Sequence, residues 1–440
     1  MFLLAGYKMK YADQISEIIN AFSPAPLNSS QMNEFYCSNT MEYRMSDKYS
    51  SPIEDIFDMC QEQGENHNAF LLLGHRGCGK STELNRMSEK LAERGYYVKT
   101  IICNMDLDLL NIVYSDLFIL MGEALLEIAK ECKCKIKKEI LEEIKNFWDE
   151  NTKTITSQQI KDTSGEIETS IETPKLISLL KIFADIKTDL KFNEEIRQEH
   201  RQKIRIRSSK WIALLRQVSE EITRKMEGKR PIIIFEDLDK LNPKDAWEVF
   251  YNYSALLSGM PFPVIYTFPI ALSYDTKFSA LEGYFITKTL PMIKIETIEG
   301  TVFQDGVDII KEIVKKRANL HLFENGVLET LIEYTGGSLR DLFVVINSSA
   351  KRAERREDNV ICMEDAERAL AESKTFLTKR IEKKDYEFLL NIYRGNKEQV
   401  EDKEILLKML QASVVFEYNG KRWHNVHPLV VRFFKEQGLI

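Results

Sequence analysis

The middle of the chain alternates between short apolar runs and longer segments whose apolar residues recur every three or four positions. A short apolar run is typical of a buried strand, and the three-to-four spacing is typical of a helix. This alternation predicts an α/β domain with a parallel sheet. The predicted strands are 69–73, 97–102, 231–235, 263–268 and 290–295, and the predicted helices are 82–91, 107–129, 136–148, 176–192 and 194–226.

The pattern changes after residue 300. A small helical domain is predicted there, because helical segments follow one another without a strand. Two further helices then precede a hairpin, for which Asn419-Gly420 is a strong turn signal. Helices followed by a hairpin suggest a winged-helix domain. The helices are predicted at 307–319, 326–334, 339–355, 363–373, 386–393 and 404–412, and the hairpin strands at 414–418 and 423–426.

The N-terminal part carries helical patterns at 11–22 and 53–60, with a proline-containing break at 23–26 and a mixed segment at 33–49 that predicts an ordered arm. Residues 151–173 are rich in Ser, Thr and Gln and predict a flexible insertion. We therefore divide the chain into four parts. They are an N-terminal arm (1–60), an α/β core (61–300) with an insertion at about 130–210, a helical domain (301–375) and a winged-helix domain (376–440).

The composition is ordinary for a soluble globular protein, with 44% hydrophobic and 29% charged residues among 440. The net charge of −7 provides no general attraction to nucleic acid or to an anionic membrane. Seven cysteines lack the spacing of a disulfide framework or a zinc site, which predicts a reducing, cytoplasmic setting. No apolar run reaches about eighteen residues, so no membrane-spanning helix is expected. The apolar stretch at 1–6 is too short for a signal peptide.

One motif dominates the candidate chemistry. The stretch from Gly74 to Ser81 matches the G-x-x-x-x-G-K-[ST] pattern at every fixed position, between a predicted strand and a predicted helix. Such a loop aims backbone N–H groups at phosphates, and the helix adds its positive end. Lys80 is expected to reach the β- and γ-phosphates of ATP, and the Ser81 hydroxyl is expected to bind Mg²⁺. A chance glycine turn is disfavoured, because motif and context agree. The predicted nucleotide-binding residues are Gly74, His75, Arg76, Gly77, Cys78, Gly79, Lys80, Ser81 and Thr82.

A second cluster follows the strand at 231–235, which ends in Glu236-Asp237-Leu238-Asp239. A strand of a parallel sheet delivers such acids to the sheet edge beside the phosphates. One of these acids, Glu236 or Asp237, can hold Mg²⁺, usually through water, and another can orient the attacking water. Taken alone, the same residues would be read as an acidic strand cap. Thr267, near the end of another predicted strand, is placed to sense the γ-phosphate.

Basic residues supply two further candidates. Arg340 lies in the first turn of a predicted helix, shortly after Gly336-Gly337, where it can point back toward a phosphate. The alternative for Arg340 is an ion pair with a carboxylate on a neighbouring helix. The basic stretch from Arg197 to Arg207 is interpreted as a solvated helix face in preference to a phosphate-binding strip.

Together the phosphate loop, the acids after Phe235, the Gly-Gly-x-x-Arg entry to the helical domain and the C-terminal winged helix resemble AAA+ ATPases. The resemblance is to the branch that joins prokaryotic STAND-type ATPases with the origin-recognition ATPases, and it makes residues 301–375 the lid. The roles that it implies are phosphate binding by Lys80, Mg²⁺ binding by Ser81, the Walker B metal position for Glu236, the catalytic acid for Asp237, and the first and second sensors for Thr267 and Arg340.

Two departures from the family pattern stand out. The pair Glu236-Asp237 replaces the Asp-Glu of most AAA+ proteins, and Asp239 is able to share either role. No arginine occurs between Arg230 and Arg317, which includes the usual place of the arginine finger. These departures indicate a slow nucleotide switch rather than a fast ring ATPase.

Two functions fit the resemblance. The first is a regulatory ATPase that binds ATP and Mg²⁺, hydrolyses ATP slowly and switches a separate effector or partner protein, for example in a prokaryotic phage-defence or mobile-element system. The alternative is a DNA-binding loader or initiator of the origin-recognition type, which would contact DNA through Lys421, Arg422 and His424 of the hairpin and through the lid cations at 351–356. The acidic net charge counts against this alternative. Assembly into a homo-oligomer is consistent with both, no membrane contact is expected, and a small-molecule nucleotide kinase would need an acceptor site that the sequence does not offer.

Overall fold

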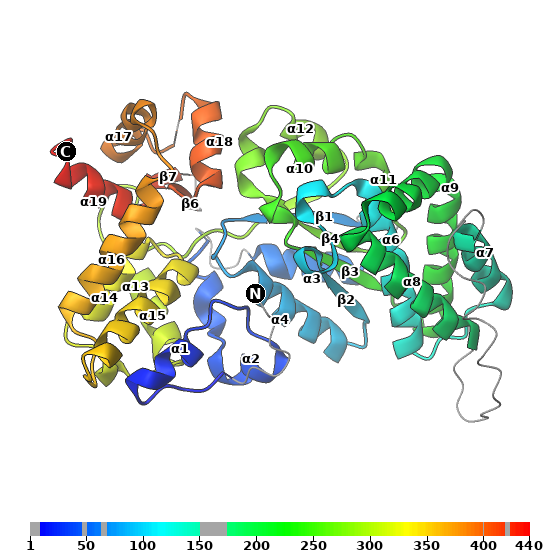
Figure 1. Cartoon of the computed structure of the whole chain (residues 1–440), viewed down its shortest axis with the longest axis horizontal. Coiled ribbons are helices and arrows are strands. Elements are labelled where there is room, and N and C mark those ends of the chain that lie inside the picture. Colours follow the sequence, from blue (N-terminus) through cyan, green and yellow to red (C-terminus); the bar gives the residue numbers. More distant parts are fainter. Residues whose placement is uncertain (1–8, 46–50, 63–67, 150–173, 399, 419–422) are drawn as a thin grey trace.

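The computed structural model describes residues 9–45, 51–62, 68–149, 174–398, 400–418 and 423–440. A central sheet separates two helical regions (Figure 1). Helices α7 (Lys138–Asp149), α8 (Pro174–Phe192) and α9 (Glu194–Lys225) lie at one end of the molecule, and the lid and C-terminal unit lie at the other. No helix in the described ranges is long and apolar enough to cross a membrane.

Five parallel strands of the described chain form the central sheet, in the order β2-β3-β4-β1-β5. The three middle strands are buried along their whole length, as their apolar runs predict. Because β4 lies between β1 and β3, the sheet places the phosphate loop, Thr267 and the acids after Phe235 at one edge. The strand bounds are β1 (Ala69–Gly74), β2 (Val98–Ile102), β3 (Ile232–Glu236), β4 (Val264–Pro269) and β5 (Ile286–Thr289).

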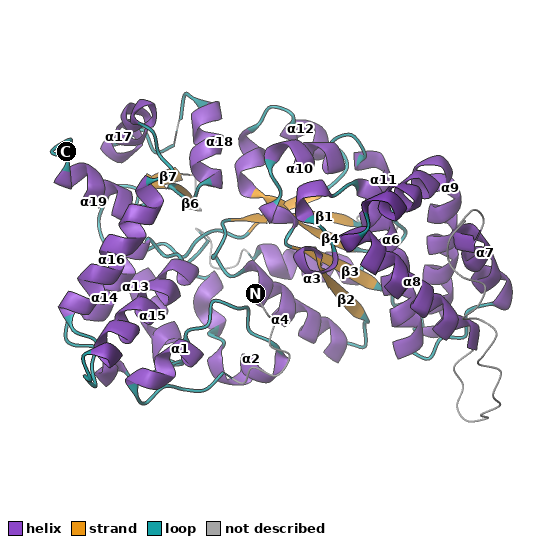
Figure 2. Ribbon diagram, in the orientation of Figure 1, coloured by secondary structure: helices purple, strands orange, loops and turns teal. Residues whose placement is uncertain are grey.

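Helices cover both faces of the sheet (Figure 2). One face, with Phe70 and Ile234, packs with α3 (Pro52–Gln61) and α4 (Lys80–Glu93). The other face packs with α5 (Cys103–Asp106), α6 (Tyr114–Glu131), α10 (Pro243–Phe250), α11 (Ser254–Ser258) and α12 (Phe278–Leu281). This arrangement confirms the predicted α/β class.

The prediction of a strand at 290–295 is wrong. The edge strand β5 ends at Thr289, and the N–H of Leu290 still bonds the carbonyl oxygen of Leu73 at 2.8 Å. Pro291 has no N–H to continue the ladder, so the chain leaves the sheet there. Leu290, Met292 and Ile293 remain fully buried, which explains why an apolar link imitates a strand.

The helices at 176–192 and 194–226 are confirmed by α8 and α9. The interpretation of the basic stretch as a solvated face is wrong for Arg197 and Arg201, which are both buried. Arg201 pairs with Asp116 of α6, with Nε 2.9 Å from Oδ1 and Nη2 2.6 Å from Oδ2. The polar side of α9 thus fastens the helix to α6. The insertion predicted at 151–173 lies outside the described residues. The helix predicted at 107–129 begins only at Tyr114, because α5 and a short 3-10 turn at Leu109–Asn111 precede it.

The lid consists of the four predicted helices, α13 (Gln304–Lys315), α14 (Val327–Thr335), α15 (Leu339–Arg355) and α16 (Met363–Thr378). The N-terminal arm packs along it, and Ala12 forms a bridge with Ala318. The helix predicted at 11–22 is shorter, with a 3-10 turn at Ile15–Glu17 followed by α1 (Ile18–Ala21). A second arm helix, α2 (Ser29–Phe35), lies against α4.

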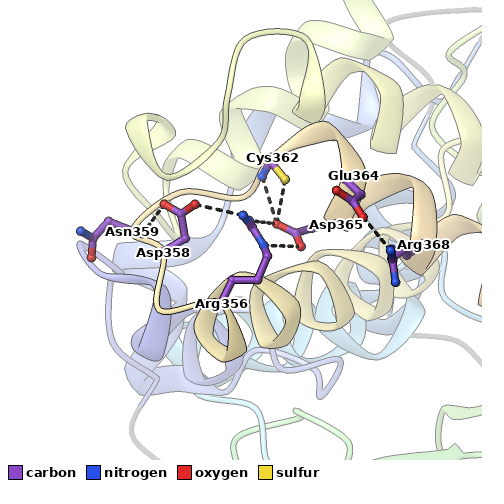
Figure 3. A network of polar contacts seen from close by, with 7 residues as sticks. All are labelled: Arg356, Asp358, Asn359, Cys362, Glu364, Asp365 and Arg368. Carbon is purple, nitrogen blue, oxygen red and sulfur yellow. Dashed lines mark hydrogen bonds and ion pairs between the residues drawn. The ribbon is translucent and has the colours of Figure 1, made fainter.

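Ion pairs fix the turn between α15 and α16 (Figure 3). Arg356 Nη2 lies 2.5 Å from Asp365 Oδ2, and Asp365 also accepts the N–H of Cys362 at 3.2 Å. Arg352 pairs with Glu372 on α16. Two of the lid cations suggested for DNA contact are therefore paired with carboxylates of the lid.

The C-terminal unit contains α17 (Tyr386–Arg394), α18 (Lys403–Gln411), the antiparallel hairpin of β6 (Val415–Tyr418) and β7 (Trp423–Val426), and α19 (Pro428–Glu436). The predicted helices and hairpin strands are confirmed. The turn at 419–420, Lys421 and Arg422 lie outside the described residues. His424 is buried and bonded to Tyr274, so its side chain is not exposed to solvent as DNA contact would require.

Candidate nucleotide-binding site

The phosphate loop leaves β1 at Gly74 and enters α4 at Lys80. Gly77 and Gly79 have φ angles of 87° and 102°, a region that favours glycine. A Cβ on Gly77 would lie 2.7 Å from the Cβ of Arg340. Glycine at this position thus provides both the turn and the close approach of the lid.

Lys80 is 7% exposed and bonds three oxygens of the core. Its Nζ donates to the carbonyls of Gly74 and His75 at 2.7 and 3.0 Å and lies 2.9 Å from Asp239 Oδ2. Burial by itself would lower the pKa of Lys80, but the carboxylate of Asp239 outweighs it and raises the pKa. Burial likewise opposes the charge of Asp239, yet Lys80 holds the pKa of that carboxyl below its usual range. The loop lysine is therefore charged and paired.

Glu236 ends β3. Burial raises the pKa of Glu236 to about 7, and the charges of Asp237 and Asp239 add to that effect. The nearby hydroxyl of Ser81 instead favours the charged form of this carboxyl by lowering its pKa. A hydroxyl and a carboxylate are the hard oxygen donors that Mg²⁺ prefers, and Mg²⁺ commonly needs only one or two protein ligands beside a nucleotide phosphate. The pair fits this role. Within the described ranges, no group of three or more His, Cys, Asp or Glu residues is arranged to hold a metal by itself.

Asp237 and Thr267, two further predicted site residues, differ in position. Asp237 faces the pocket with a left-handed φ of 71°, and its Oδ1 lies 2.5 Å from Lys240 Nζ. The buried hydroxyl of Thr267 donates to the carbonyl of Phe235 at 3.3 Å and accepts the N–H of Leu238 at 3.0 Å. Thr267 thus braces the loop that carries the acids, and its predicted role as a γ-phosphate sensor stays a prediction.

A pocket of about 960 Å³ of empty space, counting its open mouth, lies between the arm, the phosphate loop and the lid. The loop side contributes Arg76, Gly77, Gly79, Lys80, Ser81 and Thr82 together with Asp237 and Asp239, as predicted. The opposite side combines an apolar surface, which includes a proline-rich stretch of the arm, with three arginines. Its residues include Pro24, Ala25, Pro26, Leu27, Phe35 and Tyr36 of the arm and Ile313, Leu339 and Phe343 of the lid. A phosphate-binding side facing an apolar side suits a nucleotide.

Three arginines from the arm and lid line the same pocket, namely Arg44, Arg317 and Arg340. Only Arg340 is predicted from the sequence, and it lies in the first turn of α15 as expected. The two glycines before it are enclosed. A Cβ on Gly337 would lie 2.0 Å from the carbonyl oxygen of Ile293, and one on Gly336 would lie 3.1 Å from the ring of Phe416. Arg44 and Arg317 lie in stretches that match no motif, so no sequence signal marks them.

Not every residue of the phosphate loop faces the pocket. Cys78 is buried in the core below the loop. His75 points toward the C-terminal hairpin, and its Nε2 accepts the backbone N–H of Glu417 in β6 at 2.7 Å. Burial, helped by the charge of Lys80, lowers the pKa of His75 to about 3, so the ring is neutral and able to accept this bond. Tyr274 extends the contact, because its hydroxyl donates to Glu417 Oε2 at 2.6 Å.

Comparison with known proteins places the site in a family. Residues 47–277, just over half of the 440-residue chain, match the KAP family P-loop domain. The chain belongs to this family. The KAP-family match and the parallel sheet with its phosphate loop together confirm the predicted P-loop NTPase fold. No curated protein matches this KAP-family chain.

Several solved structures are similar to this KAP-family protein at low sequence identity. The Walker-type ATPase of Pyrococcus abyssi is 15% identical with a TM-score of 0.42, over 94% of this chain and 99% of that chain. The Orc1 protein of Aeropyrum pernix in complex with DNA is 11% identical with a TM-score of 0.37, over 91% and 97%. Cdc6p of Pyrobaculum aerophilum is 13% identical with a TM-score of 0.37, over 95% and 98%.

Proposed function

We propose that the protein is an AAA+-type regulatory ATPase, which binds ATP with Mg²⁺, hydrolyses it slowly and uses the bound nucleotide to set the position of its C-terminal unit. The observation that carries this proposal is the hydrogen bond from the N–H of Glu417 to Nε2 of His75. It joins the phosphate loop itself to the hairpin of another part of the chain.

Lys80 provides the means by which a nucleotide would act on this contact. Its Nζ donates to the carbonyls of Gly74 and His75. The β- and γ-phosphates of ATP compete for the same ammonium group. Binding of ATP would therefore draw Lys80 away from the carbonyl of His75. This would weaken the hydrogen bond between the His75 side chain and the hairpin. ADP offers no γ-phosphate and would withdraw Lys80 less, and only such a difference lets a nucleotide bias two positions.

The lid would respond to the same nucleotide. Arg340 lines the pocket and lies against Gly77, so a γ-phosphate there is within reach of its guanidinium. Ser81 and Glu236 would hold Mg²⁺, which neutralises phosphate charge, while Asp237 would orient the attacking water. We assign the output to a separate partner or effector protein in the cytoplasm, bound through a C-terminal winged-helix domain.

Limited proteolysis tests the coupling. Trypsin sites at Lys379, Arg380, Lys383 and Lys384 are exposed in the link between the lid and α17. We expect faster cleavage there with ATP than with ADP. His75→Leu removes the acceptor but keeps the carbonyl that meets Lys80, so it should bind ATP and be cleaved quickly with either nucleotide. Tyr274→Phe leaves the His75 bond in place and is the matched control. It should change the cleavage rates less than His75→Leu does.

Equal cleavage of the wild type with ATP, with ADP and without nucleotide would contradict the switch. The DNA-binding alternative is tested in the same preparation by measuring the ATPase rate with and without duplex DNA. A rate that rises several-fold with DNA and falls back with added salt would favour a loader or initiator. An unchanged rate is expected for the proposed switch.

A further inference from the structure

Arg44 is an unusual side chain for the end of a surface arm. It is 2% exposed, and no carboxylate lies within ion-pair distance of it in the part of the chain that the structure describes. Its Nε is buried without a hydrogen-bond partner among those residues. Burying a guanidinium without a counter-charge is costly, so such a group usually faces an anion.

The surroundings of Arg44 indicate where that anion would lie. Its Nη1 donates to the carbonyl of Pro291 at 2.6 Å, which fixes the plane of the guanidinium. Its Nη2 would lie 3.4 Å from a Cβ on Gly79, the N-cap of α4. Arg44 also lines the pocket that contains Lys80, Ser81 and Thr82. The guanidinium therefore faces the pocket at the end where the free N–H groups of α4 begin.

We infer that Arg44 is a phosphate-binding residue, supplied to the nucleotide site by the N-terminal arm. This inference rests on the proposed nucleotide site. A planar guanidinium held by one carbonyl keeps its remaining N–H donors for phosphate oxygens, and Arg suits such two-point contacts better than Lys. Arg44 lies beside Gly79, whereas Arg340 lies beside Gly77. We therefore assign to Arg44 a phosphate that ATP and ADP share, and to Arg340 the γ-phosphate. The arm thereby brings a cation to the pocket from within the same chain.

The competing explanation is that Arg44 only ties the arm to Pro291. The two explanations differ in what a phosphate adds. If Arg44 is only a structural tie, its loss lowers the stability of the protein with and without ligand. It then changes the affinities for adenosine and for ATP equally. If Arg44 binds phosphate, its loss weakens the binding of ATP, ADP and inorganic tripolyphosphate. The affinity for adenosine then stays unchanged.

The test compares Arg44→Met, Arg44→Lys and the control Arg86→Ala. Met fills the buried space without a charge. Arg86 is a partly exposed arginine on α4, 3.6 Å from Glu83, and is not among the pocket residues. Affinities for ATP, ADP and adenosine are measured by titration calorimetry, and the rise in Tm caused by inorganic tripolyphosphate is measured by thermal unfolding.

We expect Arg44→Met to bind ATP and ADP about 10- to 100-fold more weakly, as for loss of a charge-assisted contact. It should also lose most of the Tm rise with tripolyphosphate. Arg44→Lys should recover part of both effects, and Arg86→Ala should match the wild type. An Arg44→Met protein that folds and keeps wild-type affinity for ATP would overturn the role of Arg44 while leaving the nucleotide site intact. Equal losses for adenosine and ATP would also overturn it. Failure of the wild type to bind ATP would instead reject the site as a whole.

Discussion

The two sides of the nucleotide pocket differ in how their charges are compensated. On the core side, Lys80 is paired with Asp239, and Asp237 is paired with Lys240. On the arm and lid side, Arg44, Arg317 and Arg340 have no ion pair within the described ranges. Most charges of the core side thus face an opposite charge, whereas the three arginines of the other side present positive charge to the pocket.

Arg317 illustrates this difference. It is buried, its Nη1 donates to the carbonyl of Ala21 at 2.9 Å, and its guanidinium stacks over the ring of Phe343. Burial lowers the pKa of Arg317 to about 10, so it remains charged at neutral pH. The acids and the loop lysine of the core side therefore compensate one another, while the three arginines of the arm and lid carry positive charge that an anionic ligand can meet.

The largest effect is expected from breaking the core side at Lys80. Lys80→Ala removes the loop cation that meets the β- and γ-phosphates, so ATP affinity should fall by about 100-fold or more. It also leaves Asp239 buried without a partner, which should lower the free energy of unfolding by about 3–5 kcal/mol.

Adding Asp239→Asn to Lys80→Ala separates these effects. The double variant should regain much of the stability and none of the affinity. Calorimetry with ATP and thermal unfolding measure the two properties independently. If Lys80→Ala bound ATP as well as the wild type does, the assignment of the site would have to be abandoned.

A smaller effect is expected at Asp237, which faces the pocket from the core side. Asp237→Asn keeps the size of the side chain and tolerates the left-handed backbone of this position. We expect ATP to bind while its turnover falls at least roughly tenfold, as for loss of a group that orients water. A steady-state phosphate-release assay measures the turnover. If Asp239→Asn lost more turnover than Asp237→Asn, the roles of these two acids would be reversed.

The smallest effect is expected on the lid side. Arg340→Ala should bind ADP nearly normally and lose about fivefold to tenfold of the preference for ATP, because the proposed contact of Arg340 is with the γ-phosphate alone. Arg352→Ala on the same helix is the matched control, since Arg352 pairs with Glu372 away from the phosphate loop. Titration of both nucleotides gives the affinity ratio. An unchanged ratio together with a lower Tm would reduce Arg340 to a packing residue.

The sequence is sufficient to predict the core of this molecule because its signals are local. Four of the five strands follow from apolar runs, and the phosphate loop follows from fixed spacing between a strand and a helix. The edge strand is misplaced, because the buried residues around Pro291 carry the same apolar signal as a strand. This link differs from a strand because Pro291 has no backbone N–H to donate, and a hydrophobicity pattern contains no information about that donor.

The rest of the site depends on residues that are distant in the chain. Arg44 reaches the pocket because Pro291 accepts its hydrogen bond, a contact across 247 positions. His75 matches a variable position of the motif, and its partner Glu417 lies 342 positions away. Spacing rules describe neighbours within one helix, strand or loop, so they contain no information about such contacts. The buried Arg197 and Arg201 show the same limit, since only packing against α6 distinguishes them from a solvated face.

The enclosed glycines at the start of α15 have a mechanical consequence. Gly336 touches the hairpin on one side, with its carbonyl accepting the hydroxyl of Tyr418 at 2.6 Å, and Gly337 touches the carbonyl of Ile293 on the other. The start of α15 is therefore packed closely on both sides, by the hairpin and by the link at Ile293. A rotation of α15 would therefore also displace the hairpin, so the lid and the C-terminal unit would move together.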